Sequence, residues 1–203
     1  MVSRMVLLSP IARSESPRAG RNGFSLIEVM TTLAVASLLL ATAWPAMSHL
    51  VAQSRASLAL NQMLGAVQLT RHVAVTHRTR ATLCSSQGPT CKGRDHWHEG
   101  AMIFLDRNAD RIRQTSETIV RSFPAIDSGK VTWRSFRRRA TLTVLPSGYT
   151  DWQNGSFRYC PANGDLRYAR QIIINAQGRA RKANDNDGDG IVEGADGAPI
   201  RCG

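Results

Sequence analysis

The 203-residue sequence predicts an α+β fold in which a long N-terminal helix packs on a β-rich C-terminal head. Three observations predict this fold. Residues 24–47 are almost entirely apolar and long enough to form a membrane-spanning helix. Residues 48–77 continue with the periodicity of an amphipathic helix. Residues 78–203 then alternate short strand-like runs with turn residues.

The segment before the apolar run is basic. Residues 1–23 contain four arginines and one glutamate and are rich in Ser, Pro and Gly, a composition that is not typical of folded structure. Within residues 24–47 the only charged side chain is Glu28. A carboxylate inside an apolar helix is costly in lipid, so it usually has a partner or a function.

The sequence GFSLIEVM at residues 23–30 resembles the processing site of type IV pilins and pseudopilins. The resemblance implies that a prepilin peptidase removes residues 1–23 as a leader, cutting between Gly23 and Phe24, and methylates the amine of Phe24. It also implies that Glu28 neutralises the terminal amine of a neighbouring subunit, an attraction that is strong in an apolar filament core. Residues 24–47 are then a transmembrane helix in the inner membrane and a filament-core helix after assembly. The alternative is an ordinary single-span anchor.

The next segment, residues 48–77, is expected to lie against a sheet. Leu60, Leu64, Val67 and Ala74 fall on one face of the predicted helix. This helix therefore has an apolar stripe that needs a partner surface.

The head, residues 78–203, contains seven strand-like runs, at residues 79–84, 101–106, 118–124, 130–136, 140–146, 156–160 and 170–176. Its four cysteines, Cys84, Cys91, Cys160 and Cys202, are an even set, which is expected of disulfides formed in an oxidising compartment. Three pairings are possible, and we favour Cys84 with Cys91 and Cys160 with Cys202. A zinc site at Cys84 and Cys91 with His96 and His98 is the less favoured alternative, because the spacing is irregular.

Three segments of the head, at residues 97–121, 145–160 and 169–182, resemble the GspH/FimT family of type IV minor pilins and type II secretion pseudopilins. The resemblance implies a type IV pilin-like fold and other pilin or pseudopilin subunits as partners. It also implies a single-pass protein of the bacterial inner membrane with its head in the periplasm, and later a place in the pilus at the cell surface. The sequence contains no nucleophile elbow, phosphate loop or metalloprotease helix, so we expect no enzymatic activity.

The formal net charge of +11 suggests an anionic partner, either nucleic acid or lipid. The segment GRAR at residues 178–181 resembles segments of FimT-type minor pilins that are associated with DNA binding, which implies that Arg179 and Arg181 contact double-stranded DNA. Lys182 is a further candidate, and a second basic cluster consists of Arg134, Arg137, Arg138 and Arg139. Contacts to phosphate would be independent of DNA sequence. The alternative is a solvated arginine face or one that contacts a neighbouring subunit.

An acidic loop follows at residues 185–196. Asp185, Asp187 and Asp189 alternate, Gly190 follows them, and Asp196 takes the twelfth position, close to the spacing of an EF-hand calcium loop. The sequence thus suggests Ca²⁺ bound by these four aspartates, although a flexible polar loop is the alternative.

Our hypothesis is a FimT-like minor pilin that binds DNA at the cell surface for uptake in natural transformation. The alternatives are a GspH-like pseudopilin of a type II secretion system and a structural minor pilin that primes pilus assembly.

Overall fold

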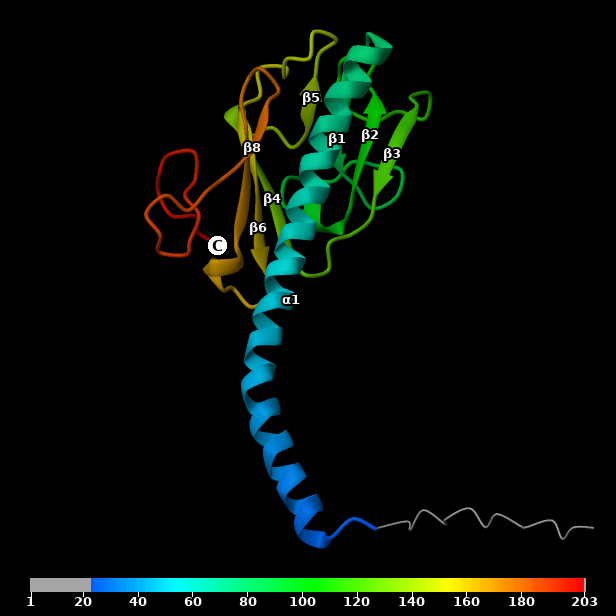
Figure 1. Cartoon of the computed structure of the whole chain (residues 1–203). Coiled ribbons are helices and arrows are strands. Elements are labelled where there is room, and N and C mark those ends of the chain that lie inside the picture. The colour runs from blue at the N-terminus through cyan, green and yellow to red at the C-terminus, as the bar shows by residue number, and fades with distance from the viewer. Residues whose placement is uncertain (1–22, 203) are drawn as a thin grey trace, which may run out of the picture. The chain divides into compact units, whose positions relative to one another are not determined.

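The computed structural model describes residues 23–202. The predicted leader, residues 1–23, lies outside the described residues except for Gly23. The described residues contain the helix α1, Leu26–His77, followed by eight strands and three short 3-10 helices (Figure 1). It divides into two compact units, the first ending at Trp44 and the second running from Pro45 to the C-terminus.

The first unit contains the apolar beginning of α1. Its large side chains are exposed, including Leu26, Leu33 and Leu40. The hydroxyl groups of Thr31 and Ser37 donate to backbone carbonyls three residues earlier, at 3.0 and 2.8 Å, which satisfies them within the helix. Among the described residues, α1 is the helix that is long and apolar enough to cross a membrane.

The second unit begins with the amphipathic part of α1. Leu60, Val67 and Ala74 are buried and Leu64 is half-buried against the same core, which confirms the predicted apolar stripe. Several positions of the stripe are alanines, which lets the helix backbone approach the strands closely. In Figure 1 this part of the helix runs past both sheets of the head.

The strands form two antiparallel sheets. The first has the order β3-β2-β1-β5 and consists of β1 (Ala81–Ser85), β2 (Ala101–Leu105), β3 (Ile119–Phe123) and β5 (Leu142–Val144). The second has the order β4-β6-β7-β8 and consists of β4 (Gly129–Ser135), β6 (Gly155–Pro161), β7 (Arg170–Ile174) and β8 (Ala180–Lys182). Each of the seven predicted runs overlaps a strand, while β8 was not among them.

Aromatic side chains fill the core near the second sheet. Trp97, from the 3-10 helix η1 (Trp97–Glu99), and Trp133, on β4, both pack against Phe157 on β6, with ring centroids 4.6 and 4.4 Å from the phenylalanine ring. All three are at most 1% exposed. Because these rings fix one face of β4 and β6 inside the core, the alternate residues of both strands must face outward.

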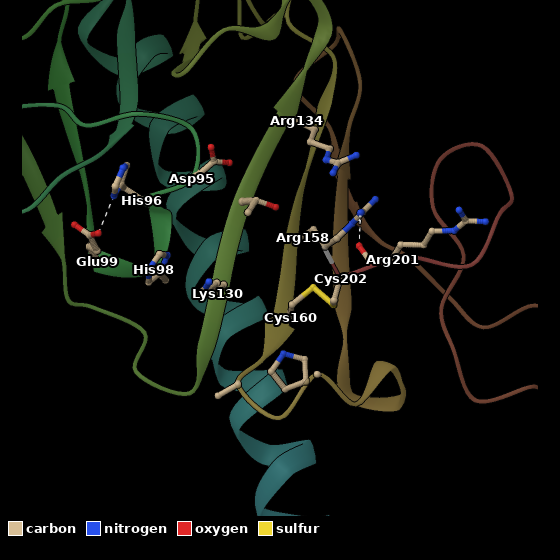
Figure 2. Close-up of a pocket in the computed structure, with 14 residues that line it drawn as sticks. Asp95, His96, His98, Glu99, Lys130, Arg134, Arg158, Cys160, Arg201 and Cys202 are labelled. Carbon is tan, nitrogen blue, oxygen red and sulfur yellow. Dashed lines mark hydrogen bonds and ion pairs between the residues drawn. A yellow bond between two sulfur atoms is a disulfide. The ribbon is translucent and has the colours of Figure 1, made fainter.

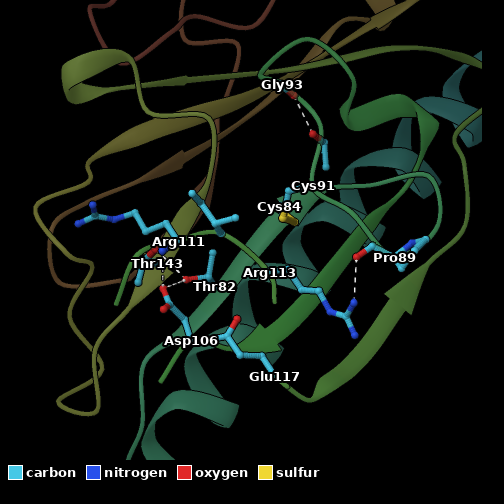
Figure 3. Close-up of a disulfide and its surroundings, with 12 residues drawn as sticks. Thr82, Cys84, Pro89, Cys91, Gly93, Asp106, Arg111, Arg113, Glu117 and Thr143 are labelled. Atoms are coloured by element: carbon cyan, nitrogen blue, oxygen red, sulfur yellow. Dashed lines mark hydrogen bonds between the residues drawn. A yellow bond between two sulfur atoms is a disulfide. The ribbon is translucent and has the colours of Figure 1, made fainter. Parts of the chain in front are cut away.

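The head contains two disulfides, and their pairing confirms the one that we favoured. Cys84 is bonded to Cys91 (Figure 3) and Cys160 to Cys202, with Cα atoms 5.7 and 5.8 Å apart. The first closes a loop after β1, and its two thiols are not available to zinc. The second joins β6 to the C-terminal tail, so the tail is held beside the second sheet.

Candidate functional site

The outer face of the second sheet carries basic side chains. Along β4, Trp133 is buried while Lys130 and Arg134 are exposed. Along β6, Phe157 is buried and Arg158 faces the other side. This alternation follows from the period of two residues in a strand.

The strand register places Arg181 on this same face. Arg134 pairs with Ser156, Ser156 pairs with Ile173, and Ile173 pairs with Arg181. Paired residues of adjacent strands point to the same side of a sheet, so Arg134 and Arg181 lie on one face, three strand spacings or about 14 Å apart.

Arg179 is held by the turn between β7 and β8. The Asn175 amide donates to the Arg179 carbonyl oxygen at 3.1 Å, and the Arg179 amide donates to Asn175 Oδ1 at 3.0 Å. Gly178 forms the turn with a φ of +71°, and a Cβ atom there would lie 2.5 Å from the carbonyl oxygen of Gly148. Glycine is therefore required, and Arg179 lies exposed at the end of this turn, immediately before β8 and two residues before Arg181.

A groove of about 570 Å³ borders the face (Figure 2). Arg134, Arg158 and Arg201 all line it, and Arg158 Nη1 donates to the Arg201 carbonyl oxygen at 2.6 Å. Burial of the Arg158 guanidinium, followed by the positive charge of Arg134, lowers the pKa of Arg158 below its ordinary value. The two guanidinium groups thus lie close enough to repel each other.

Sequence reasoning missed two of these arginines. Arg158 lies between Phe157 and Tyr159, and the alternation of buried and outward residues in this strand was a signal that could have found it. Arg201 had no such signal, because its position depends on the bridge between Cys160 and Cys202.

Three arginines of this face lack partners. The guanidinium groups of Arg134, Arg179 and Arg181 make no hydrogen bond or ion pair with the described residues 23–202. The ion pairs of the described chain involve other cations, namely Lys92 and His96 with Glu99, Arg111 with Asp151, and Arg167 with Asp165. Unpaired guanidinium groups on one surface attract anions such as phosphate. We call Arg134, Arg158, Arg179 and Arg181 the arginine face.

Lys182, also predicted to bind DNA, lies outside the arginine face. Lys182 pairs with Ile172 of β7, whose side chain is buried, and its Nζ donates to Asn61 Oδ1 on α1 at 3.0 Å. Lys182 therefore points away from the arginine face.

Arg137 and Arg138 belong to a short 3-10 helix, η2 (Phe136–Arg138), and Arg139 follows it. The Arg137 guanidinium lies over the Phe136 ring, 5.5 Å from its centroid. Arg138 lines a hollow together with Arg134. Arg139 is half-buried, and its carbonyl oxygen accepts from the Ser135 hydroxyl at 3.0 Å. Of these three, Arg138 is thus the one that the structure brings beside the arginine face.

The residues of the predicted processing site lie at the start of the described chain. Gly23 and Phe24 precede α1, and Phe24 is 83% exposed. Glu28 lies in the first turn of α1, and its side chain is exposed.

The acidic loop after β8 gathers three of the four predicted carboxylates. Asp185, Asp187 and Asp189 lie together with Glu193, each offering an oxygen within 4.8 Å of the others. Asp196 is not in this group. Its Oδ1 accepts from the Ala198 amide at 3.3 Å, and its charge acts on Arg158. The sequence signal for Glu193 was its position four residues after Asp189.

A second acidic stretch, residues 106–117, forms a closed turn. Asp106 Oδ2 accepts from the Thr82 hydroxyl and the Arg111 amide, at 3.0 and 3.2 Å (Figure 3). Both oxygens of Glu117 accept from backbone amides, those of Arg107 and Gln114. These carboxylates order the loop between β2 and β3.

Residues 59–178 match the family model described as type II transport protein GspH, and residues 18–44 match the prokaryotic N-terminal methylation motif. Two crystal structures of the Pseudomonas aeruginosa type IV minor pilin FimU, in different crystal forms, are similar to the chain at 18% identity. One covers 76% of this chain and 97% of its own, with a TM-score of 0.49, and the other covers 65% and 92%, with a TM-score of 0.46. No curated protein matches the chain.

The GspH family model spans more than half of the sequence, and the methylation motif covers the apolar beginning of α1. The chain therefore belongs to the GspH family of pilin-like subunits, the minor pilins and pseudopilins that carry an N-terminal methylation motif.

Proposed function

We propose that this chain is a minor pilin of a type IV pilus and that its head binds double-stranded DNA at the cell surface during uptake for natural transformation. The observation that carries the proposal is the arginine face. Three of its four guanidinium groups lack a partner among the described residues, and Arg158 donates only to a carbonyl oxygen. Such groups are suited to charge-assisted hydrogen bonds with phosphate.

The dimensions of the face fit a duplex. Arg134 and Arg181 lie about 14 Å apart across the sheet, which is comparable with the width of the major groove of B-DNA, about 12 Å. Phosphates on both sides of a groove are then within reach of long arginine side chains. Contacts of this kind carry no base readout, which suits a protein that takes up DNA of any sequence.

The proposal includes processing and anchoring at the N-terminus. A prepilin peptidase cuts between Gly23 and Phe24 and methylates Phe24, and α1 then anchors the subunit in the inner membrane with its head in the periplasm. In the filament, Glu28 pairs with the terminal amine of a neighbouring subunit. Two observations support this: the match to the methylation motif and the exposed apolar side chains of α1 up to Trp44.

A second candidate function is that of a pseudopilin in a type II secretion system. It is favoured by the family model, whose description is a type II transport protein. In that function the arginine face would contact an acidic partner subunit or secreted protein instead of DNA.

The test is DNA binding by the full-length protein in a non-ionic detergent. A fluorescent duplex of random sequence is titrated at low salt with the native chain, with Arg134→Ala plus Arg181→Ala, and with the control Arg107→Ala plus Arg121→Ala. The control removes the same charge from exposed positions outside the arginine face. We expect the first variant to bind at least about tenfold more weakly, since hydrogen bonds to charged groups contribute about 1.5–3 kcal/mol each, and the control to bind nearly as the native chain.

Absence of binding by the native chain at low salt would refute the DNA proposal. Equal losses in both variants would show attraction by net charge alone and would likewise refute a role for the arginine face. Either result leaves two candidates, the pseudopilin of a type II secretion system and the structural minor pilin. Capture of acidic partner subunits would test the first of them.

A further inference from the structure

The acidic loop lies in the tail that follows β8. Asp185, Asp187 and Asp189 are exposed, whereas Glu193 is only 6% exposed. One oxygen from each residue lies within 4.8 Å of the others. Four carboxylates thus converge on a small volume at the edge of the head.

Glu193 is the feature that distinguishes this group from an ordinary acidic loop. Its Oε2 accepts two hydrogen bonds from Asn186, from the backbone amide at 2.7 Å and from Nδ2 at 2.8 Å. Its Oε1 is buried and has no hydrogen-bond partner among the described residues. A buried carboxylate oxygen without a protein donor is unfavourable unless a ligand reaches it.

The backbone holds Glu193 in this position. The adjacent Val192 is buried in a small apolar cluster with Ala183 and Ile200. The Glu193 amide donates to the Asn184 carbonyl oxygen at 3.0 Å, and the Ile200 amide donates to the Val192 carbonyl oxygen at 3.1 Å. These contacts fix the backbone at Glu193, and the two hydrogen bonds from Asn186 hold its side chain inward.

No positive side chain neutralises the group. In the described chain, none of the four carboxylates forms an ion pair with Lys, Arg or His, although the protein has a formal net charge of +11. Carboxylates at this separation repel one another strongly. A bound cation removes that repulsion.

The loop backbone is already shaped around the carboxylates. The amides of Gly188 and Gly190 donate to the two oxygens of Asp185, at 2.7 and 2.8 Å. Asp187 Oδ1 and Asp189 Oδ1 each accept one amide as well, at 3.1 and 2.7 Å. This leaves the second oxygens of these two aspartates available.

We infer that Asp185, Asp187, Asp189 and Glu193 bind one Ca²⁺ ion. Calcium takes oxygen ligands at about 2.3–2.6 Å, so two ligands on opposite sides of the ion lie about 5 Å apart, and four oxygens that all lie within 4.8 Å of one another are close enough to share one such ion. Magnesium requires about 2.0–2.1 Å and a near-ideal octahedral geometry, and it usually keeps several water ligands, so a cage of four carboxylates favours calcium. Zinc prefers nitrogen and sulfur ligands, and this group has none.

The inferred site differs from the one that the sequence spacing suggested. Asp196, at the twelfth position, is replaced by the buried Glu193 at the ninth. The loop is therefore more compact than an EF-hand loop, and it lies between β8 and the cysteine that joins the tail to β6. Calcium would fix the tail at the end opposite this disulfide.

The test uses the full-length protein in a non-ionic detergent, after treatment with a chelator. Calcium is titrated by calorimetry, and the melting temperature is measured with and without 5 mM CaCl₂, with MgCl₂ in a parallel series. The variants are Glu193→Gln and Asp187→Asn, and the control is Asp196→Asn, which removes the same charge from the same loop outside the group. Asp187 is exposed, so its variant stays informative if Glu193→Gln fails to fold.

We expect one Ca²⁺ per chain, with a dissociation constant of about 10⁻⁴–10⁻³ M or tighter, and a higher melting temperature with calcium for the native chain and for Asp196→Asn. Glu193→Gln and Asp187→Asn should bind at least about tenfold more weakly, and magnesium should have a smaller effect. The inference is overturned if the folded native chain takes up no calcium at 5 mM, or if Asp196→Asn loses binding while Asp187→Asn and Glu193→Gln retain it.

Discussion

The salt dependence of DNA binding tests the arginine face most sharply, because it counts phosphate contacts. Each phosphate neutralised by a protein cation releases counterions, so the logarithm of the binding constant falls with the logarithm of salt concentration with a slope of about −0.9 per contact. The four arginines of the face, Arg134, Arg158, Arg179 and Arg181, therefore give a slope of about −3.6. Raising the salt from 50 to 200 mM should weaken binding by about 150-fold.

The variant Arg179→Ala plus Arg181→Ala removes two of the four contacts. Its slope should be about −1.8, and the same increase in salt should weaken binding by only about 12-fold. Lys182→Ala is the matched control, because Lys182 is the next residue of the same strand but its Nζ donates to Asn61 on the helix. Its slope should equal that of the native chain.

Fluorescence anisotropy with one duplex at five salt concentrations provides both slopes. A variant that binds more weakly but keeps the native slope would refute the reasoning, since the two arginines would then act without touching phosphate. A reduced slope in Lys182→Ala would show that the pairing register of β8 with β7 does not determine which cations contact DNA.

Three further predictions concern the head itself. Gly178→Ala should lower the free energy of unfolding, measured in urea, by more than Gly164→Ala. Both glycines have φ near +70°, a conformation that costs an alanine about 1–2 kcal/mol, but only at Gly178 would the new Cβ contact a backbone oxygen. Equal losses would contradict the close contact. Glu99→Gln should destabilise the head above pH 4.5 and have no effect near pH 2. Hydrogen bonds from its histidine and lysine partners lower the pKa of Glu99 from 4.5 to about 2. The stabilisation that comes from this shift is lost as the pH falls through that value. Urea melts over this pH range should show the difference shrinking, and a constant difference would be the wrong outcome. Replacing both Cys160 and Cys202 by serine should lower the free energy of unfolding by roughly 4 kcal/mol, because the disulfide restricts the entropy of the unfolded chain over a separation of 42 residues. A loss under about 1 kcal/mol in the same urea assay would contradict this prediction.

Much of the fold could be predicted from local patterns. The stripe of Leu60, Val67 and Ala74 repeats at the helical period, and burial of one face of a helix is what that period reports. The strand-like runs were equally visible, because apolar β-branched and aromatic residues cluster in them. The strand β8 was missed because its three residues, Ala180–Lys182, are mostly charged and pair at the edge of the sheet, where apolar content is not needed.

The candidate sites could be predicted only in part, because a sequence lists which residues are basic or acidic but not which share a face. Arg181 and Lys182 are neighbours in the chain, and the pairing of β8 with β7 sends the first outward and the second towards α1. The same limit applies to the acidic loop. Asp196 has the position that the sequence spacing predicts, but Glu193 lies in the group of carboxylates, next to the buried Val192. In both cases a contact with another element decides the direction of the side chain. A pattern of charges along the chain therefore becomes a site only after the register is known, and this is why Lys182 and Asp196, which lie near the two sites in sequence but outside them in space, are informative controls.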